Sequence, residues 1–203
     1  MFIVLFFSSF AASGAFQAVA AFSSPSEVLK IIHYSIPSIA IILYILVKSR
    51  KAEPLVLKPG KKDLISCLIA FPCLLITGIA ISAISMITVP ITQPQSTSPT
   101  NAAGWIMLGL FCLIFAYMEE SFFRFYLLSK RKEMNLSAPS ALAVSAILFS
   151  ICHIYLGPLG FINSAIAGLI LGYMFLKWGS LHGIAIAHAL YNITAYVIYS
   201  VLN

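Results

Sequence analysis

Long apolar runs, separated by short polar links, dominate the chain. Seven such runs cover residues 1–22, 31–47, 64–89, 105–128, 137–155, 161–176 and 181–202. At ~1.5 Å per residue, helices of this order of length can cross the hydrocarbon core of a bilayer. No run shows the strict alternation that is typical of β-barrel strands. The pattern therefore predicts an all-α transmembrane bundle of about seven helices.

Composition supports a polytopic membrane protein over a soluble domain. The chain has 203 residues, of which 61% are hydrophobic and 9% charged, and its mean hydropathy is +1.00. Soluble domains are far more polar. We therefore expect one integrated membrane domain. The net charge of +6 does not indicate nucleic-acid binding, because the basic residues fall in short clusters between apolar runs.

The distribution of charge predicts a topology. Six of the twelve basic residues lie in the link 48–63, whereas the proline-rich link 90–101 carries no charge. Basic links stay in the cytoplasm. With a cytoplasmic amino terminus, ten of the twelve basic residues are cytoplasmic, leaving Lys30 exported and Arg124 within the membrane. This predicts an exported carboxyl terminus. Residues 1–22 lack a positively charged start, which favours a retained helix over a cleaved signal peptide.

The fourth run contains the most unusual segment, Y-M-E-E-S-F-F-R at Tyr117 to Arg124. An ionisable side chain at the bilayer centre costs about 2.5 to 3.5 kcal/mol on insertion scales, so such groups face a bundle interior and usually mark function. Glu120 and Arg124 are four residues apart and are expected to form an ion pair. Glu119 points about 100° away, which makes it the candidate for chemistry. The alternative is that all three form a buried charge network that only fixes packing.

Two later runs carry further polar groups. His153 lies in the fifth run, and His188 and Asn192 lie four residues apart in the seventh, so these two share one helix face. Glu119 and His188 are each eleven residues from a cytoplasmic basic residue, or about 16 Å along a helix. We expect these two at the same depth, and His153 somewhat nearer the exported side.

These residues are the components of a hydrolase that uses water directly. A carboxylate in an apolar site can serve as general base, and histidine can help orient the water. An imidazole N–H and an amide N–H can stabilise an oxyanion. No G-x-S-x-G is present, and Asp63, the only aspartate, falls in a link. No cofactor is firmly predicted. The alternative is a zinc site made by Glu119, His153 and His188, in which Asn192 would be a poor ligand.

The ordered motifs resemble a known family of membrane proteins. They are E-E-x-x-x-R, F-x-x-x-H and H-x-x-x-N, at Glu119, Glu120 and Arg124, at Phe149 and His153, and at His188 and Asn192. This set is similar to the CPBP or Abi family, which includes type II CAAX prenyl endopeptidases and bacteriocin-processing or immunity proteins. The resemblance covers about residues 104–195. Residues 104–203 would then be the catalytic helices, and residues 1–103, with about three helices, carry no recognised motif.

The resemblance implies a role for each motif residue. Glu119 and His153 would activate water, and His188 and Asn192 would form the oxyanion hole. The remaining motif residues, Glu120, Arg124 and Phe149, would support the site. Members of the family have been described both as metalloproteases and as metal-free glutamate enzymes, and the spacing does not decide between them.

The resulting hypothesis is an intramembrane endopeptidase that cleaves a membrane-embedded or lipid-anchored protein. Its expected partners are the lipid bilayer and a protein or peptide substrate, which the family lets us expect to be lipidated. One alternative is a non-proteolytic bacteriocin-immunity or partner-binding protein. Another is a proton-coupled transporter, although the inverted repeats typical of transporters are not obvious in the sequence.

Overall fold

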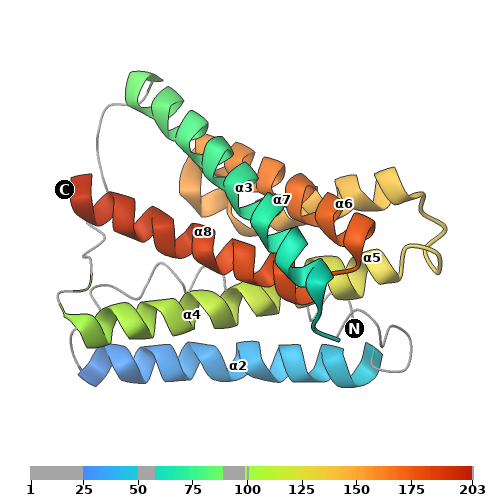
Figure 1. Ribbon diagram of the computed structural model, residues 1–203, viewed down its shortest axis with the longest axis horizontal. Coiled ribbons are helices and arrows are strands. Elements are labelled where there is room, and N and C mark those ends of the chain that lie inside the picture. The colour runs from blue at the N-terminus through green and yellow to red at the C-terminus, as the bar shows by residue number, and fades with distance from the viewer. Residues whose placement is uncertain (1–24, 50–57, 89–98, 100, 203) are drawn as a thin grey trace.

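The computed structural model describes residues 25–49, 58–88, 99 and 101–202, and within these residues every regular element is a helix (Figure 1). The elements are α2 (Pro25–Ser49), α3 (Lys61–Thr88), α4 (Ala102–Glu120), the π-helix η1 (Ser121–Tyr126), α5 (Leu127–Ser129), α6 (Ala138–Cys152), the 3₁₀ turn η2 (Ile154–Leu156), α7 (Gly157–Trp178) and α8 (Leu181–Leu202). The all-α prediction is confirmed.

Four helical stretches of the described chain are long and apolar enough to cross a membrane. They are Lys61–Ile87, Ala102–Ser129, Ile154–Trp178 and Leu181–Ile198. Shorter apolar helices cover Ser35–Lys48 and Ala138–Cys152. A helical membrane bundle is therefore confirmed. The run predicted at residues 1–22 lies outside the described residues, so the seventh helix stays a prediction.

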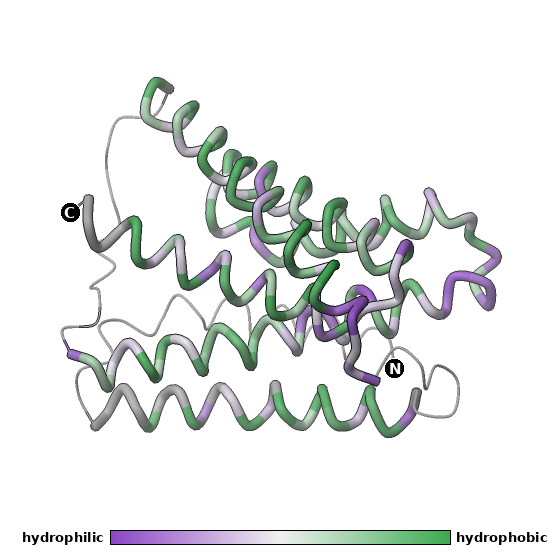
Figure 2. Tube along the Cα trace, viewed as in Figure 1, coloured by the Kyte–Doolittle hydropathy of each residue, from purple (hydrophilic) through white to green (hydrophobic). Residues whose placement is uncertain are grey.

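Hydrophilic residues gather at one end of the bundle, which we call the basic end. Here α2, α5 and α7 end, and α3, α6 and α8 begin (Figure 1). Figure 2 shows hydrophilic positions at the start of α3 and in the link after α5. The described basic residues at this end are Lys48, Lys58, Lys61, Lys62, Lys130, Arg131, Lys132 and Lys177. The predicted topology places the basic links on one side of the membrane, and these residues do lie at one end of the bundle.

The fourth run forms the centre of the bundle, but not as the uninterrupted α-helix that its pattern predicts. Its α-helical part ends at Glu120, and the six residues of η1 continue it as a π-helix. The N–H of Leu127 donates to the carbonyl oxygen of Phe122, five residues earlier. All six residues of η1 are buried. π-Helical turns are rare and often occur at functional sites, and no periodicity of apolar residues distinguishes them from an α-helix.

The fifth run also ends earlier than the sequence suggests. Helix α6 ends at Cys152, so His153 is its C-cap residue, with φ −108° and ψ 13°, and does not lie within the helix. After η2 the chain reverses direction at Gly157, which has φ +77°. Only glycine adopts that conformation readily. Pro158 follows at the start of α7, where its missing N–H costs no hydrogen bond.

Asp63 was expected in a cytoplasmic link, but the structure places it in the first turn of α3 with its side chain buried. Its Oδ1 accepts hydrogen bonds from Ser180 Oγ (2.6 Å) and from the Gly183 N–H (3.4 Å). Its Oδ2 accepts one from the Gly60 N–H (2.7 Å). These contacts, which we call the Asp63 clasp, fix the start of α3 to the turn between α7 and α8.

Helices α6 and α7 approach closely at Gly168. A Cβ atom there would lie 3.0 Å from Ala146 Cα and 3.1 Å from Ala146 Cβ. We expect Gly168→Val to lower the stability of the bundle by about 1–3 kcal/mol, because the neighbouring backbone cannot make room. The matched control is Gly109→Val, since a Cβ at Gly109 meets only Ile193 Cδ1 at 3.9 Å. Thermal unfolding in detergent compares the two, and equal losses would contradict the packing argument.

Candidate active site

The two glutamates are the last residues of α4, and both are buried in the bundle. Glu119 is 4% exposed and Glu120 is 0% exposed. Because adjacent helical residues point in different directions, the two carboxylates have different neighbours.

Glu120 forms a buried ion pair with Arg124. The distance from Arg124 Nη1 to Glu120 Oε1 is 3.0 Å, and both side chains are 0% exposed. Arg124 Nη2 also donates to the Gly168 carbonyl oxygen at 3.4 Å. The guanidinium carbon lies 4.4 Å from the centroid of the Phe149 ring, which is a cation–π distance. Arg124 thereby joins η1 to α6 and α7.

His188 connects the two glutamates. Its Nδ1 lies 2.9 Å from Glu120 Oε1, and its Nε2 lies 3.7 Å from Glu119 Oε2. A carboxylate can only accept a hydrogen bond, so Nδ1 carries the hydrogen. When His188 is neutral, its Nε2 carries no hydrogen and can only accept a hydrogen bond. This atom faces Glu119. The sequence did not indicate this contact with Glu120, because residues 68 positions apart carry no spacing signal.

His153 approaches Glu119 from the other side. Its Nδ1 donates to the Phe149 carbonyl oxygen at 2.8 Å, and its Nε2 lies 3.8 Å from Glu119 Oε1. The structure therefore brings His153 to the same level as Glu119, whereas helix counting placed it nearer the exported side. Counting residues along one continuous helix gave the wrong depth for His153, because α6 ends before this residue. The Phe149 ring packs against both imidazoles, at centroid distances of 4.5 Å to His153 and 5.8 Å to His188.

Three acceptors thus converge: the Glu119 carboxylate and the Nε2 atoms of both histidines. Their separations of 3.7 and 3.8 Å exceed a direct hydrogen bond. A water molecule beside these atoms would have two O–H groups to donate to them. The arrangement can therefore hold a water molecule against a base.

The zinc alternative uses the same three residues. Within the described part of the chain, no group of three His, Cys, Asp or Glu side chains is arranged to hold a metal ion. Metal dependence therefore stays a prediction for chemical analysis. Asn192 lies one helical turn beyond His188 on α8 and is half-buried, so the i, i+4 spacing places it on the same face.

Two aromatic neighbours of the site were not indicated by the motifs. The hydroxyl of Tyr117 lies 3.0 Å from His182 Nδ1, which ties α4 to the first turn of α8. The ring of Tyr155, on η2, stacks on His153 with a centroid distance of 6.0 Å and an interplanar angle of 29°. The only sequence signal for Tyr117 was its position two residues before Glu119.

Comparison with protein families identifies this part of the chain. Residues 100–194 match the family described as type II CAAX prenyl endopeptidase Rce1-like. Over these residues the chain is similar to that family, and we call them the Rce1-like domain. The resemblance inferred from the motifs is confirmed, and the Rce1-like match contains all seven motif residues. At the level of the family this assignment implies protease activity. Searches of curated proteins and of solved structures gave no significant match.

Proposed function

We propose that the Rce1-like domain is an intramembrane endopeptidase in which Glu119 activates a water molecule for attack on a peptide bond. One observation carries this proposal: the Glu119 carboxylate lies between the Nε2 atoms of His153, at 3.8 Å, and His188, at 3.7 Å. Each imidazole has its Nδ1 engaged elsewhere, by Phe149 and Glu120 respectively.

The reaction would proceed by general base catalysis. Glu119 takes a proton from the water while the oxygen attacks the scissile carbonyl carbon, with His153 accepting the second O–H of the water. The tetrahedral oxyanion then collapses, the C–N bond breaks, and the proton passes from Glu119 to the leaving amine. Atoms and charge balance without a covalent enzyme intermediate.

We assign stabilisation of the oxyanion to Asn192 and His188. The Asn192 amide has two N–H groups to donate. Since Nδ1 of His188 donates to Glu120, its Nε2 can donate to the oxyanion only when both ring nitrogens carry a hydrogen. Arg124 in turn balances the charge of Glu120. This gives the buried ion pair a function besides packing.

The substrate we propose is a membrane-embedded or lipid-anchored protein, with a prenylated CAAX terminus as the first candidate. Glu119 and His188 lie on helices that are long and apolar enough to span the bilayer, and the matched family is described as a prenyl endopeptidase. A lipid anchor would concentrate a peptide at the membrane and so favour its access to a buried site.

We also infer that the basic end faces the cytoplasm, because basic links are retained on that side. Helix α8 then runs outward and the carboxyl terminus is exported. Reporter fusions after Leu202 and within the link at residues 130–136 distinguish the two orientations. A carboxyl-terminal reporter that is active only in the cytoplasm would contradict this assignment.

The function is tested with purified protein in lipid nanodiscs and two peptides, one farnesylated at its CAAX cysteine and one not. We expect mass spectrometry to detect release of the carboxyl-terminal tripeptide from the farnesylated peptide alone. Cleavage of both peptides would support an endopeptidase without prenyl specificity. Cleavage of neither, by protein that is folded by circular dichroism, would contradict the CAAX substrate.

Metal removal is a separate prediction. If Glu119 activates water without a metal ion, then EDTA and 1,10-phenanthroline should leave the rate of peptide cleavage unchanged within about twofold, because no step requires a Lewis acid. Elemental analysis of the same sample should show less than stoichiometric zinc. Activity that is lost in chelator and restored by added zinc would establish the alternative site of Glu119, His153 and His188.

A further inference from the structure

Asp63 is a buried carboxylate, 8% exposed, that the proposed reaction does not use. The starts of two helices meet at its side chain. It is the third residue of α3, and its Oδ2 accepts a hydrogen bond from the Gly60 N–H at 2.7 Å. Its Oδ1 accepts from Ser180 Oγ and from the Gly183 N–H, at the start of α8. Because negative charge is favoured at helix amino termini, this one carboxylate stabilises both helix starts.

Ser180 connects Asp63 to the first turn of α8. It directly precedes Leu181, the first residue of that helix, and its Oγ accepts from the Gly183 N–H at 3.1 Å, as an N-cap side chain does. The same hydroxyl donates to Asp63 at 2.6 Å. The two backbones also touch here, since a Cβ atom at Gly183 would lie 2.9 Å from Asp63 Cα and closer still to the Asp63 carbonyl oxygen. Helix α8 therefore begins in direct contact with α3.

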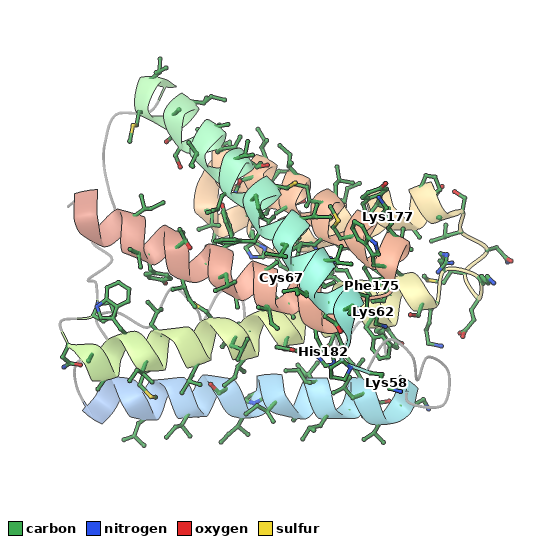
Figure 3. All side chains as sticks on the ribbon, in the orientation of Figure 1. Lys58, Lys62, Cys67, Phe175, Lys177 and His182 are labelled. Carbon is green, nitrogen blue, oxygen red and sulfur yellow. The ribbon has the colours of Figure 1, made fainter. Side chains whose placement is uncertain are left out.

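The first turn of α8 is also attached to α4. His182 Nδ1 lies 3.0 Å from the hydroxyl of Tyr117, and the centroids of the two rings are 5.8 Å apart. Tyr117 comes two residues before Glu119 on α4. Figure 3 shows His182 and Lys62 in the region where α3 and α8 begin. One turn of α8 is thus fixed to two neighbouring helices.

This attachment lies close to the proposed catalytic residues of α8. His188 is five residues beyond Gly183, or about 8 Å along the helix, and Asn192 follows one turn later. His188 Nδ1 meets Glu120 Oε1 at 2.9 Å only if α8 has the correct axial position and rotation. A misplacement of about 1 Å, even one caused far from the chemistry, can lower a reaction rate by about 10²-fold. The start of α8 therefore bears directly on the geometry of the site.

We propose that Asp63 is a positioning residue, which sets the axial position and rotation of α8 and so places His188 and Asn192 against Glu119. This inference rests on the proposed function, because it assigns Asp63 a role in the same reaction. Asp63 contacts neither the scissile bond nor the attacking water and acts only through α8. A cap that served stability alone would change the unfolding midpoint and leave the kcat of the folded protein unaltered.

The first test is Asp63→Ala, measured with the farnesylated peptide in nanodiscs. We expect kcat to fall by roughly 10²-fold, while KM changes by less than about twofold, because the interactions that are lost act in the transition state. Asp63→Asn should restore most of kcat, since its Oδ1 still accepts from Ser180 and Gly183, although its NH₂ group cannot accept from Gly60. Amide hydrogen exchange over residues 181–190 should become faster in Asp63→Ala, and this readout requires no cleavage.

Two serine variants provide a matched comparison, which also serves if Asp63→Ala fails to fold. Ser180→Ala removes the side chain that links Asp63 to α8, and it should lower kcat by roughly tenfold. Ser137→Ala removes the N-cap of α6, where Ser137 Oγ accepts from the Ser140 N–H at 3.2 Å. Helix α6 also begins at the basic end, but its start has no contact with Asp63 in the clasp. The kcat of Ser137→Ala should equal that of wild type.

Three results would overturn the inference. They are an unchanged kcat in folded Asp63→Ala, equal losses in Ser180→Ala and Ser137→Ala, and an Asp63→Asn variant that is as slow as Asp63→Ala. Failure of the proposed function is distinguishable, because wild type would then cleave neither peptide. Hydrogen exchange still tests the clasp in that case, and unchanged exchange of α8 in Asp63→Ala would show that Asp63 does not hold this helix.

Discussion

Glu119→Gln should lower the rate of peptide cleavage by ~10²–10⁴-fold, the usual contribution of a general base. The substitution keeps the size of the side chain but removes the group that takes the proton from water. Because Glu119 lies between the two Nε2 atoms, the glutamine amide can still bond to them, so the fold should persist. Initial rates with the farnesylated peptide measure the loss, and circular dichroism verifies folding.

The matched control for this prediction is Glu133→Gln, which makes the same chemical change at a side chain that is 69% exposed. We expect its activity to equal that of wild type. A folded Glu119→Gln variant with full activity would remove Glu119 as the base. If Glu119→Gln and His188→Ala both still protect cells in a bacteriocin challenge, an immunity or partner-binding function would be favoured.

Arg124→Met should destabilise the protein by about 3–5 kcal/mol, the cost of leaving one member of a buried ion pair without its partner. Arg124 and Glu120 are both 0% exposed, so water cannot solvate the remaining carboxylate. The removal also breaks the contacts of the guanidinium with Gly168 and Phe149. The drop in the midpoint of thermal unfolding in detergent measures the effect.

A double variant separates stability from activity at this pair. Glu120→Gln/Arg124→Met removes both charges and should recover much of the stability, since buried pairs are often replaceable by neutral groups. Its cleavage rate should remain low, because His188 loses the carboxylate that orients it. The surface control Lys130→Met breaks an exposed pair and should cost at most about 1 kcal/mol. A double variant as unstable as Arg124→Met would contradict the charge argument.

The parts of the structure that follow local rules could be predicted from the sequence. Apolar runs predicted the helices, because a bilayer requires each span to satisfy its own backbone. The spacing of Glu120 and Arg124 predicted their contact, since residues four apart share a face. The high cost of an intramembrane charge is enough to distinguish Glu119 from the apolar residues around it.

What could not be predicted depends on contacts between distant segments. The bond between His188 and Glu120 requires α8 to pack against α4 at one register, which no spacing encodes. The depth of His153 was misjudged because the end of α6 was placed too late. Asp63 looked like an ordinary polar link residue, and only the approach of Ser180 and Gly183 makes it a buried acceptor.

The order of the helices along the chain has a consequence for biosynthesis. Glu119, Glu120 and Arg124 are made on α4 and η1, before the ribosome has synthesised α7 or α8. The carbonyl of Gly168 and the imidazole of His188 reach this charged segment only when those later helices are inserted. A nascent chain therefore carries its buried charges incompletely satisfied and its proposed water-activating site incomplete. Assembly of the last helix then becomes the step that both relieves the charges and completes the site, which would keep a partly inserted chain inactive toward neighbouring proteins.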